Sequence, residues 1–257
     1  RDFCLSRGLG DVYKRQGSEA TRFTIIGDVG PDGSERKLLC PGLAFLPAAA
    51  LVDYELTLGL PPRASADTGI DALTHALEAY VSRRAGPVSD GFALQALALI
   101  APNLRRVVAA GVNHPARDAV MLGATYAGLA FSNASVALVH GMSRPIGARF
   151  HVPHGLSNAM LLPTVTAWSL DAAPTRYAEA ARAMGLNGID DLVPWLQALN
   201  DDLDVPTPAR FGIAADAWEQ AIPTMADQAL ASGSPANNPR LADAAAIAEL
   251  YHDVFEN

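Results

Sequence analysis

The stretch GIDALTHALEAY, residues 69–80, places an acidic residue and a histidine inside an otherwise apolar helical pattern. Asp71 and His75 are four residues apart, so on a helix their side chains project from the same face, one turn apart. The alanines and leucines around them direct this face toward the core. A buried carboxylate beside an imidazole is either a satisfied ion pair or two ligands of one metal ion, and this stretch alone leaves both interpretations open.

A second stretch, LVHGMSRPIGARFHVPHG at residues 138–155, gathers three of the six histidines of the chain. His140 and His154 each precede a glycine, which permits close approach to a bound group. A core histidine is normally solitary, so three close together require another account. Asp71, His75, His140 and His154 supply one oxygen and three nitrogen ligands, a set that suits Fe(II) or Zn(II) better than Mg²⁺ or Ca²⁺.

The motifs that surround these residues resemble the iron-containing (group III) alcohol dehydrogenases, which share their fold with dehydroquinate synthase and glycerol dehydrogenase. The resemblance extends over residues 17–257. It rests on GIDALTHALEAY and on further stretches: GSEAT (17–21), LVDYELTLGLPP (51–62), AGLAFSNASVALVHGMSRPIG (127–147), FHVPHGLSNAMLLP (150–163) and NNPR (237–240).

The resemblance implies a function for the four clustered residues. In that family an aspartate and three histidines hold the metal, and these fall on Asp71, His75, His140 and His154. Fe(II) is the expected ion, with Zn(II) as the alternative. The ion polarises an alcohol oxygen while hydride passes to NAD or NADP. Ser18, Thr21 and Lys37 match positions associated with that cofactor, although a strand-end threonine and a solvated lysine are equally good interpretations of the last two.

One position departs from the family pattern and affects the expected catalytic groups. Arg144 stands where many members have a further histidine near the nicotinamide. It either forms a structural ion pair or binds a substrate carboxylate with its fork of donors. His151 is a candidate replacement for the missing imidazole, or else supports a ligand or lies at the surface.

Composition limits the classes of partner. The chain has 257 residues, is 50% hydrophobic and carries a formal charge of -8. This balance favours a small-molecule alcohol or carbonyl substrate, with no nucleic acid and no membrane. No window reaches the roughly 18 uninterrupted apolar residues of a spanning helix. Two cysteines, Cys4 and Cys40, are too few for a disulfide framework, and we expect a cytoplasmic protein.

The chain divides into three segments of different character. Residues 1–16 read RDFCLSRGLGDVYKRQ, lack periodicity and resemble translated adapter sequence rather than a flexible arm. Residues 17–60 are expected to be a remnant of an α/β nucleotide-binding domain, and residues 61–257 a helical metal-binding catalytic domain. No Gly-rich pyrophosphate turn is visible. The fragment alone is therefore predicted to be inactive, and the full-length form to be a homo-oligomer.

The predicted fold is mainly α, with a small β part near the start. Strands are expected at 21–27 and 48–53, joined by a hairpin-like connection. Ser89 and Asp243 are predicted helix caps, and Pro145 is expected to break a helix. Helices are predicted at 66–84, 90–110, 116–132, 135–150, 155–162, 175–184, 190–202, 214–230 and 244–255.

The predicted function is a metal-dependent alcohol dehydrogenase that interconverts an alcohol and its aldehyde or ketone with NAD(P). A glycerol-dehydrogenase-like or maleylacetate-reductase-like specificity is the alternative within the same superfamily. A non-catalytic, metal-binding helical module is the alternative from a different class, because most of the cofactor domain is missing.

Overall fold

The computed structural model of the chain describes residues 17–29 and 35–256, and shows a mainly helical molecule. The predictions for residues 1–16 lie outside this part. The helices are α1 (Pro62–Val81), α2 (Pro87–Ile100), α3 (Leu104–Ala109), α4 (His114–Ala134), α5 (Leu138–Phe150), α6 (His154–Ser169), α7 (Pro174–Ala183), α8 (Leu192–Asp202), α9 (Pro208–Phe211), α10 (Ala215–Ala231) and α11 (Ala244–Glu256). Short 3₁₀ turns are η1 (Ser18–Ala20), η2 (Leu43–Phe45), η3 (Tyr54–Thr57), η4 (Leu170–Ala172), η5 (Ile189–Asp191) and η6 (Pro235–Asn237).

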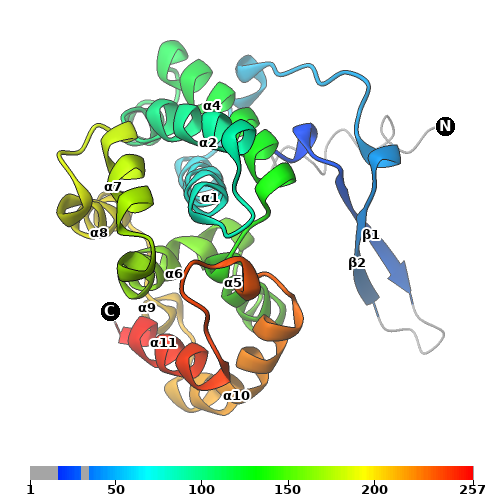
Figure 1. Ribbon diagram of the computed structural model, residues 1–257, viewed down its shortest axis with the longest axis vertical. Coiled ribbons are helices and arrows are strands. Elements are labelled where there is room, and N and C mark those ends of the chain that lie inside the picture. The colour runs from blue at the N-terminus through cyan, green and yellow to red at the C-terminus, as the bar shows by residue number, and fades with distance from the viewer. Residues whose placement is uncertain (1–16, 30–34, 257) are drawn as a thin grey trace.

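Helix α1 is the centre of the helical body, with α2 and α4 on one side and α5 and α6 on the other (Figure 1). Pro62 occupies its first turn, where a missing N–H costs nothing. Nearly all of the helix is buried, including the polar side chains of Asp67, Asp71, His75 and Glu78. Burial of charged groups is costly unless they are paired or bind metal, so these side chains of α1 require partners or a bound ion.

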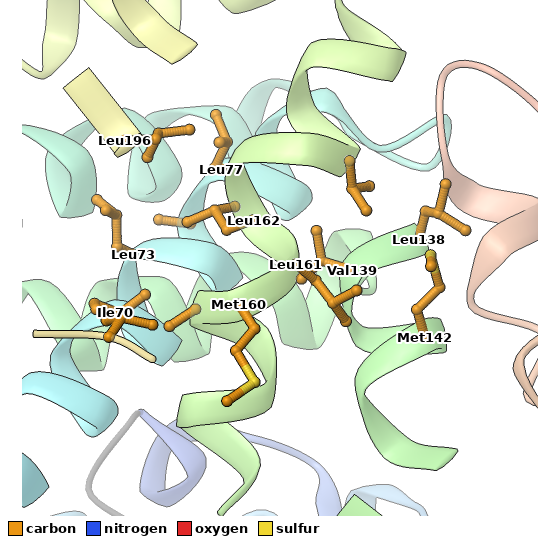
Figure 2. Close-up of a cluster of buried hydrophobic side chains, with 14 of the residues drawn as sticks. Ile70, Leu73, Leu77, Leu138, Val139, Met142, Met160, Leu161, Leu162 and Leu196 are labelled. Atoms are coloured by element: carbon orange, nitrogen blue, oxygen red, sulfur yellow. The ribbon is translucent and has the colours of Figure 1, made fainter. Parts of the chain in front are cut away.

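The core around α1 is built from long aliphatic side chains (Figure 2). Figure 2 shows Leu73 and Leu77 of α1 beside Leu162 of α6, while Leu161 of α6 lies beside Val139 of α5. Each fully buried leucine or isoleucine stabilises the fold by about 1.5–3 kcal/mol relative to exposure. This packing fixes the mutual positions of the three helices that carry the predicted ligands.

Small residues let α4 approach its neighbours closely. A Cβ atom added at Gly123 would lie 2.7 Å from Cγ1 of Ile100 in α2. At Gly128 it would lie 2.0 Å from the carbonyl oxygen of Gly17, which itself adopts a positive φ of 93°. The backbone of Gly17 therefore packs directly on the backbone of Gly128 in α4.

Strands β1 (Phe23–Val29) and β2 (Glu35–Pro41) form an antiparallel pair that lies to one side of the helices (Figure 1). In the register, Phe23 is opposite Pro41 and Gly27 is opposite Lys37. The first predicted strand is close to β1. The prediction of a strand at 48–53 was wrong: those residues have no regular structure, and β1 pairs with the closer segment 35–41. Part of the predicted connection, residues 30–34, lies outside the described residues.

Proline and cap predictions failed at three places. The predicted helix 90–110 is two helices, α2 and α3, separated by a turn that contains Pro102, which cannot donate a backbone hydrogen bond. The N-cap of α2 is Gly86 and not Ser89. The Ser89 hydroxyl accepts a hydrogen bond from the Gly86 backbone N–H. Pro145 does not interrupt α5, because packing against α6 and α10 overrides local propensity. Asp243 caps α11 as predicted, accepting a hydrogen bond from the Ala246 N–H at 2.8 Å.

No single helix of the described residues combines the length and apolar character required to cross a membrane. Within this part, α4 and α5 meet these criteria only when taken together, and they are bent by 104° relative to each other.

Candidate metal centre

Three helices bring the four predicted ligands together. Asp71 and His75 lie one turn apart on α1, His140 is near the start of α5, and His154 is the first residue of α6. Oδ1 of Asp71 lies 3.4 Å from Nε2 of His140 and 3.8 Å from Nε2 of both His75 and His154. All three imidazoles therefore present the same ring nitrogen to one carboxylate oxygen.

The tightest part of this cluster comprises Asp71, His140 and His154, whose ligand atoms all lie within 4.8 Å of one another. His75 faces the same carboxylate, and its ring stacks between those of Phe131 and His140 at centroid distances of 4.3 and 4.4 Å. Stacking on both faces holds the His75 ring in its orientation toward Asp71.

The cluster is open on one side only. Asp71, His75 and His140 are buried, whereas the side chain of His154 is 42% exposed. A ligand would therefore reach the centre past His154. The other three proposed ligands, Asp71, His75 and His140, are already shielded from water.

Electrostatics within the cluster alter the pKa values of its members. Burial would raise the pKa of Asp71, but the three histidines outweigh it and hold the pKa below the usual aspartate range. Burial opposes protonation of His140, yet hydrogen bonds with Asp71 and Glu78 raise its pKa. Partial burial, together with the nearby charges of His140 and Arg144, lowers the pKa of His154. The site thus favours an ionised Asp71 carboxylate and an unprotonated His154 imidazole, the forms that bind metals.

Sequence analysis missed two residues of the site. Asn158, one turn after His154 on α6, donates from Nδ2 to Oδ1 of Asp71 at 2.6 Å and lies 3.2 Å from Nε2 of His140. Glu78, one turn after His75, contacts Nδ1 of His140 at 2.7 Å. Helical spacing from a predicted ligand was a usable signal for both.

The donor set fits a divalent cation. Glu78 accepts a hydrogen bond here, so Nδ1 of His140 carries hydrogen and Nε2 is the ring nitrogen that faces Oδ1 of Asp71. Two acceptors 3.4 Å apart require a positive charge between them, from a proton or from a metal ion. One carboxylate and three imidazoles are ligands typical of Fe(II) or Zn(II).

The predicted catalytic residues lie in the middle of α5 and at its C-cap. Arg144 is exposed one turn after His140, and its Nη1 donates to Oγ of Ser234 at 3.0 Å. Among the described residues no carboxylate oxygen lies within salt-bridge distance of Arg144, although Glu78 interacts with it electrostatically. His151 ends α5 with a left-handed φ of 57° and is exposed, and no hydrogen bond joins it to the described ligands.

The predicted cofactor residues lie in the N-terminal part. Ser18 is an exposed residue of η1, and the buried Thr21 donates from its hydroxyl to the Ser18 carbonyl oxygen at 2.9 Å. Lys37 lies in β2. The η1 turn packs on α4, a helix that carries none of the four predicted ligands.

Comparison with known proteins identifies the family. Residues 65–255 match the Fe-containing alcohol dehydrogenase family, C-terminal. The chain is 37% identical over 247 residues to the 1,3-propanediol dehydrogenase of Citrobacter freundii, a match that covers 93% of this chain and 62% of the relative.

Solved structures give the same result. A 1,3-propanediol oxidoreductase superposes with a TM-score of 0.85 at 36% identity, covering 93% of this chain and 63% of the other. The maleylacetate reductase of Agrobacterium tumefaciens has a TM-score of 0.80 at 30% identity, covering 94% and 65%. The chain thus spans less than two thirds of the relatives it matches. It belongs to the iron-containing alcohol dehydrogenase family, and matches its C-terminal helical part.

Proposed function

We propose that this chain forms the metal-binding catalytic part of an NAD(P)-dependent dehydrogenase that interconverts an alcohol and its aldehyde or ketone. The observation that carries the proposal is the convergence of Asp71, His75, His140 and His154, from three separate helices, on one carboxylate oxygen. Family membership independently supports the same reaction class.

Asp71, His75, His140 and His154 are the residues that would hold the ion, with Fe(II) favoured over Zn(II) by the family. A bound divalent cation would supply Lewis acidity toward a substrate oxygen. The chain supplies position: stacking holds the His75 ring, and the Asn158 amide holds the Asp71 carboxylate. Substrate would enter beside His154, where the cluster is open.

We further propose the domain division at about residue 60, with residues 17–60 contributed by a nucleotide-binding domain. This segment exposes large apolar side chains: Leu43, Phe45, Leu46, Leu51, Val52 and Leu56. Such density of exposed hydrophobic residues is typical of a surface that is covered in the complete protein. Ser18, Thr21 and Lys37 remain our candidates for contact with NAD or NADP.

Arg144 narrows the proposed substrate class toward anionic alcohols and aldehydes. Its guanidinium lies one turn from His140, contacts Ser234 and forms no direct salt bridge among the described residues, its charge interaction being with the more distant Glu78. Maleylacetate reductase, a structural relative, is named for a dicarboxylate. His151 stays a second candidate, as a proton-carrying group at the end of α5.

The test of the proposed function has a metal arm and a hydride arm. The purified chain should bind about one Fe²⁺ or Zn²⁺ per molecule, and Asp71→Asn should abolish this, whereas the exposed Asp190→Asn should not. The chain should then be fused to the nucleotide-binding part of the Citrobacter freundii relative and assayed for NAD(P)H oxidation with aldehydes. Metal binding without turnover in the fusion would favour the non-catalytic module instead.

A further inference from the structure

Glu78 is a buried carboxylate that is not one of the four proposed ligands but contacts one of them, His140. It is 4% exposed, lies on α1 one turn beyond His75, and reaches α5. The proposed reaction gives it no part. A buried, ionised carboxylate has to be compensated by its neighbours, so its partners reveal its role.

Three donors at the start of α5 surround the Glu78 carboxylate. Oε1 accepts a hydrogen bond from the Val139 N–H at 2.6 Å, and Oε2 accepts one from the Ala137 N–H at 2.9 Å. Oε2 also contacts Nδ1 of His140 at 2.7 Å. The first N–H groups of a helix have no partner within the helix, so Glu78 caps α5 from another element.

The contact with His140 determines which ring nitrogen is available to a metal. A carboxylate accepts hydrogen bonds and does not donate them, so a hydrogen resides on Nδ1 and Nε2 is the nitrogen left for a metal ion. That nitrogen faces Asp71. Glu78 thus determines which ring nitrogen of His140 carries hydrogen. Through its hydrogen bonds to two backbone N–H groups, Glu78 also fixes the position of α5, which carries His140.

We propose that Glu78 is a positioning residue that prepares His140 for metal binding by coupling its ring tautomer to the start of α5. This inference rests on the proposed metal centre. Removal of a hydrogen-bond partner behind a metal ligand typically lowers metal affinity by about 10–100-fold. A loss of that size is what we expect when Glu78 no longer accepts from Nδ1.

Glu78→Gln is the discriminating variant because it preserves shape but changes donor polarity. Glutamine has one acceptor oxygen and an NH₂ group that only donates. The Val139 and Ala137 N–H groups bond to different oxygens of Glu78, so the glutamine oxygen can serve only one of them. When it serves Val139, the NH₂ group takes the place of Oε2, faces Nδ1 of His140 and forces the hydrogen onto Nε2, where it blocks the metal. The exposed Glu249→Gln on α11 is the matched control, since it makes the same chemical change far from any described metal ligand.

The affinity experiment measures Zn²⁺ binding by competition with a chromophoric chelator. Wild type and Glu249→Gln should bind equally, and Glu78→Gln should bind about 10–100-fold more weakly with a helical circular dichroism spectrum like that of wild type. Equal affinity of Glu78→Gln and wild type would overturn the role of Glu78 alone. A wild-type chain that binds no Zn²⁺ would overturn the proposed metal centre, and the role of Glu78 with it.

A spectroscopic arm covers the case in which Glu78→Gln does not fold. Long-range ¹H–¹⁵N correlation spectra of the Zn²⁺-loaded wild-type chain report which nitrogen of each histidine carries hydrogen, with His140→Gln used to assign the signal. His140 should carry its hydrogen on Nδ1. A hydrogen on Nε2 of His140 in the loaded protein would overturn the proposal without any variant of Glu78.

Discussion

Gly155 lies directly against the backbone of Asp67: a Cβ atom at residue 155 would be 2.2 Å from the Asp67 carbonyl oxygen. The same atom would lie 3.3 Å from Cβ of Asp71. The first turn of α6 is therefore in backbone contact with α1, and this contact sets how near His154 comes to Asp71.

Gly155→Ala should consequently push α6 away from α1. We expect a loss of about 1–3 kcal/mol in the free energy of unfolding, as for overpacked cores, together with weaker Zn²⁺ binding. Urea denaturation and chelator competition measure the two effects. The exposed Gly91 in α2 has open space around its Cβ position, so Gly91→Ala is the control and should be neutral or stabilising. Unchanged stability of Gly155→Ala would show that α6 tolerates the shift.

Metal addition should stabilise the chain by an amount that rises with the logarithm of the ratio of free metal to Kd. At a free Zn²⁺ concentration 100 times the Kd, linkage predicts a gain of about 2.7 kcal/mol in the free energy of unfolding. Thermal melts with Zn²⁺ and with excess EDTA measure it, and Mg²⁺ should give no shift because the donors are mainly imidazoles. Asp71→Asn is expected to remove the shift. A Zn²⁺-dependent shift of full size in that variant would place the ion elsewhere.

Asn158→Asp should change the stability of the metal-free and the metal-bound protein to different extents. The Asn158 amide now donates to Asp71, and an aspartate there would place two carboxylates against each other in the metal-free protein. We expect a lower melting temperature without metal and a larger stabilisation by Zn²⁺. The exposed Asn133→Asp on α4 serves as the control for added charge. An equal loss of stability with and without Zn²⁺ would argue against contact between residue 158 and the ion.

Arg144→Ala should weaken the binding of anionic substrates selectively. A charge-assisted, two-point contact contributes about 1.5–3 kcal/mol, which is on the order of tenfold to a hundredfold in binding. In the active fusion, the KM for an ω-hydroxy acid should rise by that factor, while that of a diol of the same length stays nearly constant. Arg149→Ala, exposed on the same helix, is the control. Equal losses on both substrates would assign Arg144 a structural role.

The ligand residues could be predicted because short-range spacing and residue type identify them in the sequence. Asp71 and His75 share a helix face by spacing alone, and His140 and His154 stand out by residue type. The spacing of Glu78 from His75 marks it as a neighbour of the site, but its role depends on Ala137, Val139 and His140 of another element, and periodicity does not reveal those partners.

Long-range packing also explains the errors in the fold. The segment 48–53 has the composition of a strand, yet β1 pairs with β2, so no described strand is left beside it. Pro145 remains inside α5 because Met142 and Ile146 are buried on either side of it. Tertiary contacts decided both cases against the local propensity.

The contact between Glu78 and His140 joins residues 62 positions apart, and that between Asp71 and Asn158 joins residues 87 apart. Loop-closure entropy grows slowly with length, by about 0.6 kcal/mol per doubling, but long-range contacts slow folding. The centre can therefore assemble only after α1 has docked on α5 and α6. An isolated peptide of α5 and α6 would keep the imidazoles of His140 and His154 but would lack the carboxylates of Asp71 and Glu78, which lie on α1. A tightly bound ion would therefore show that α1, α5 and α6 have assembled.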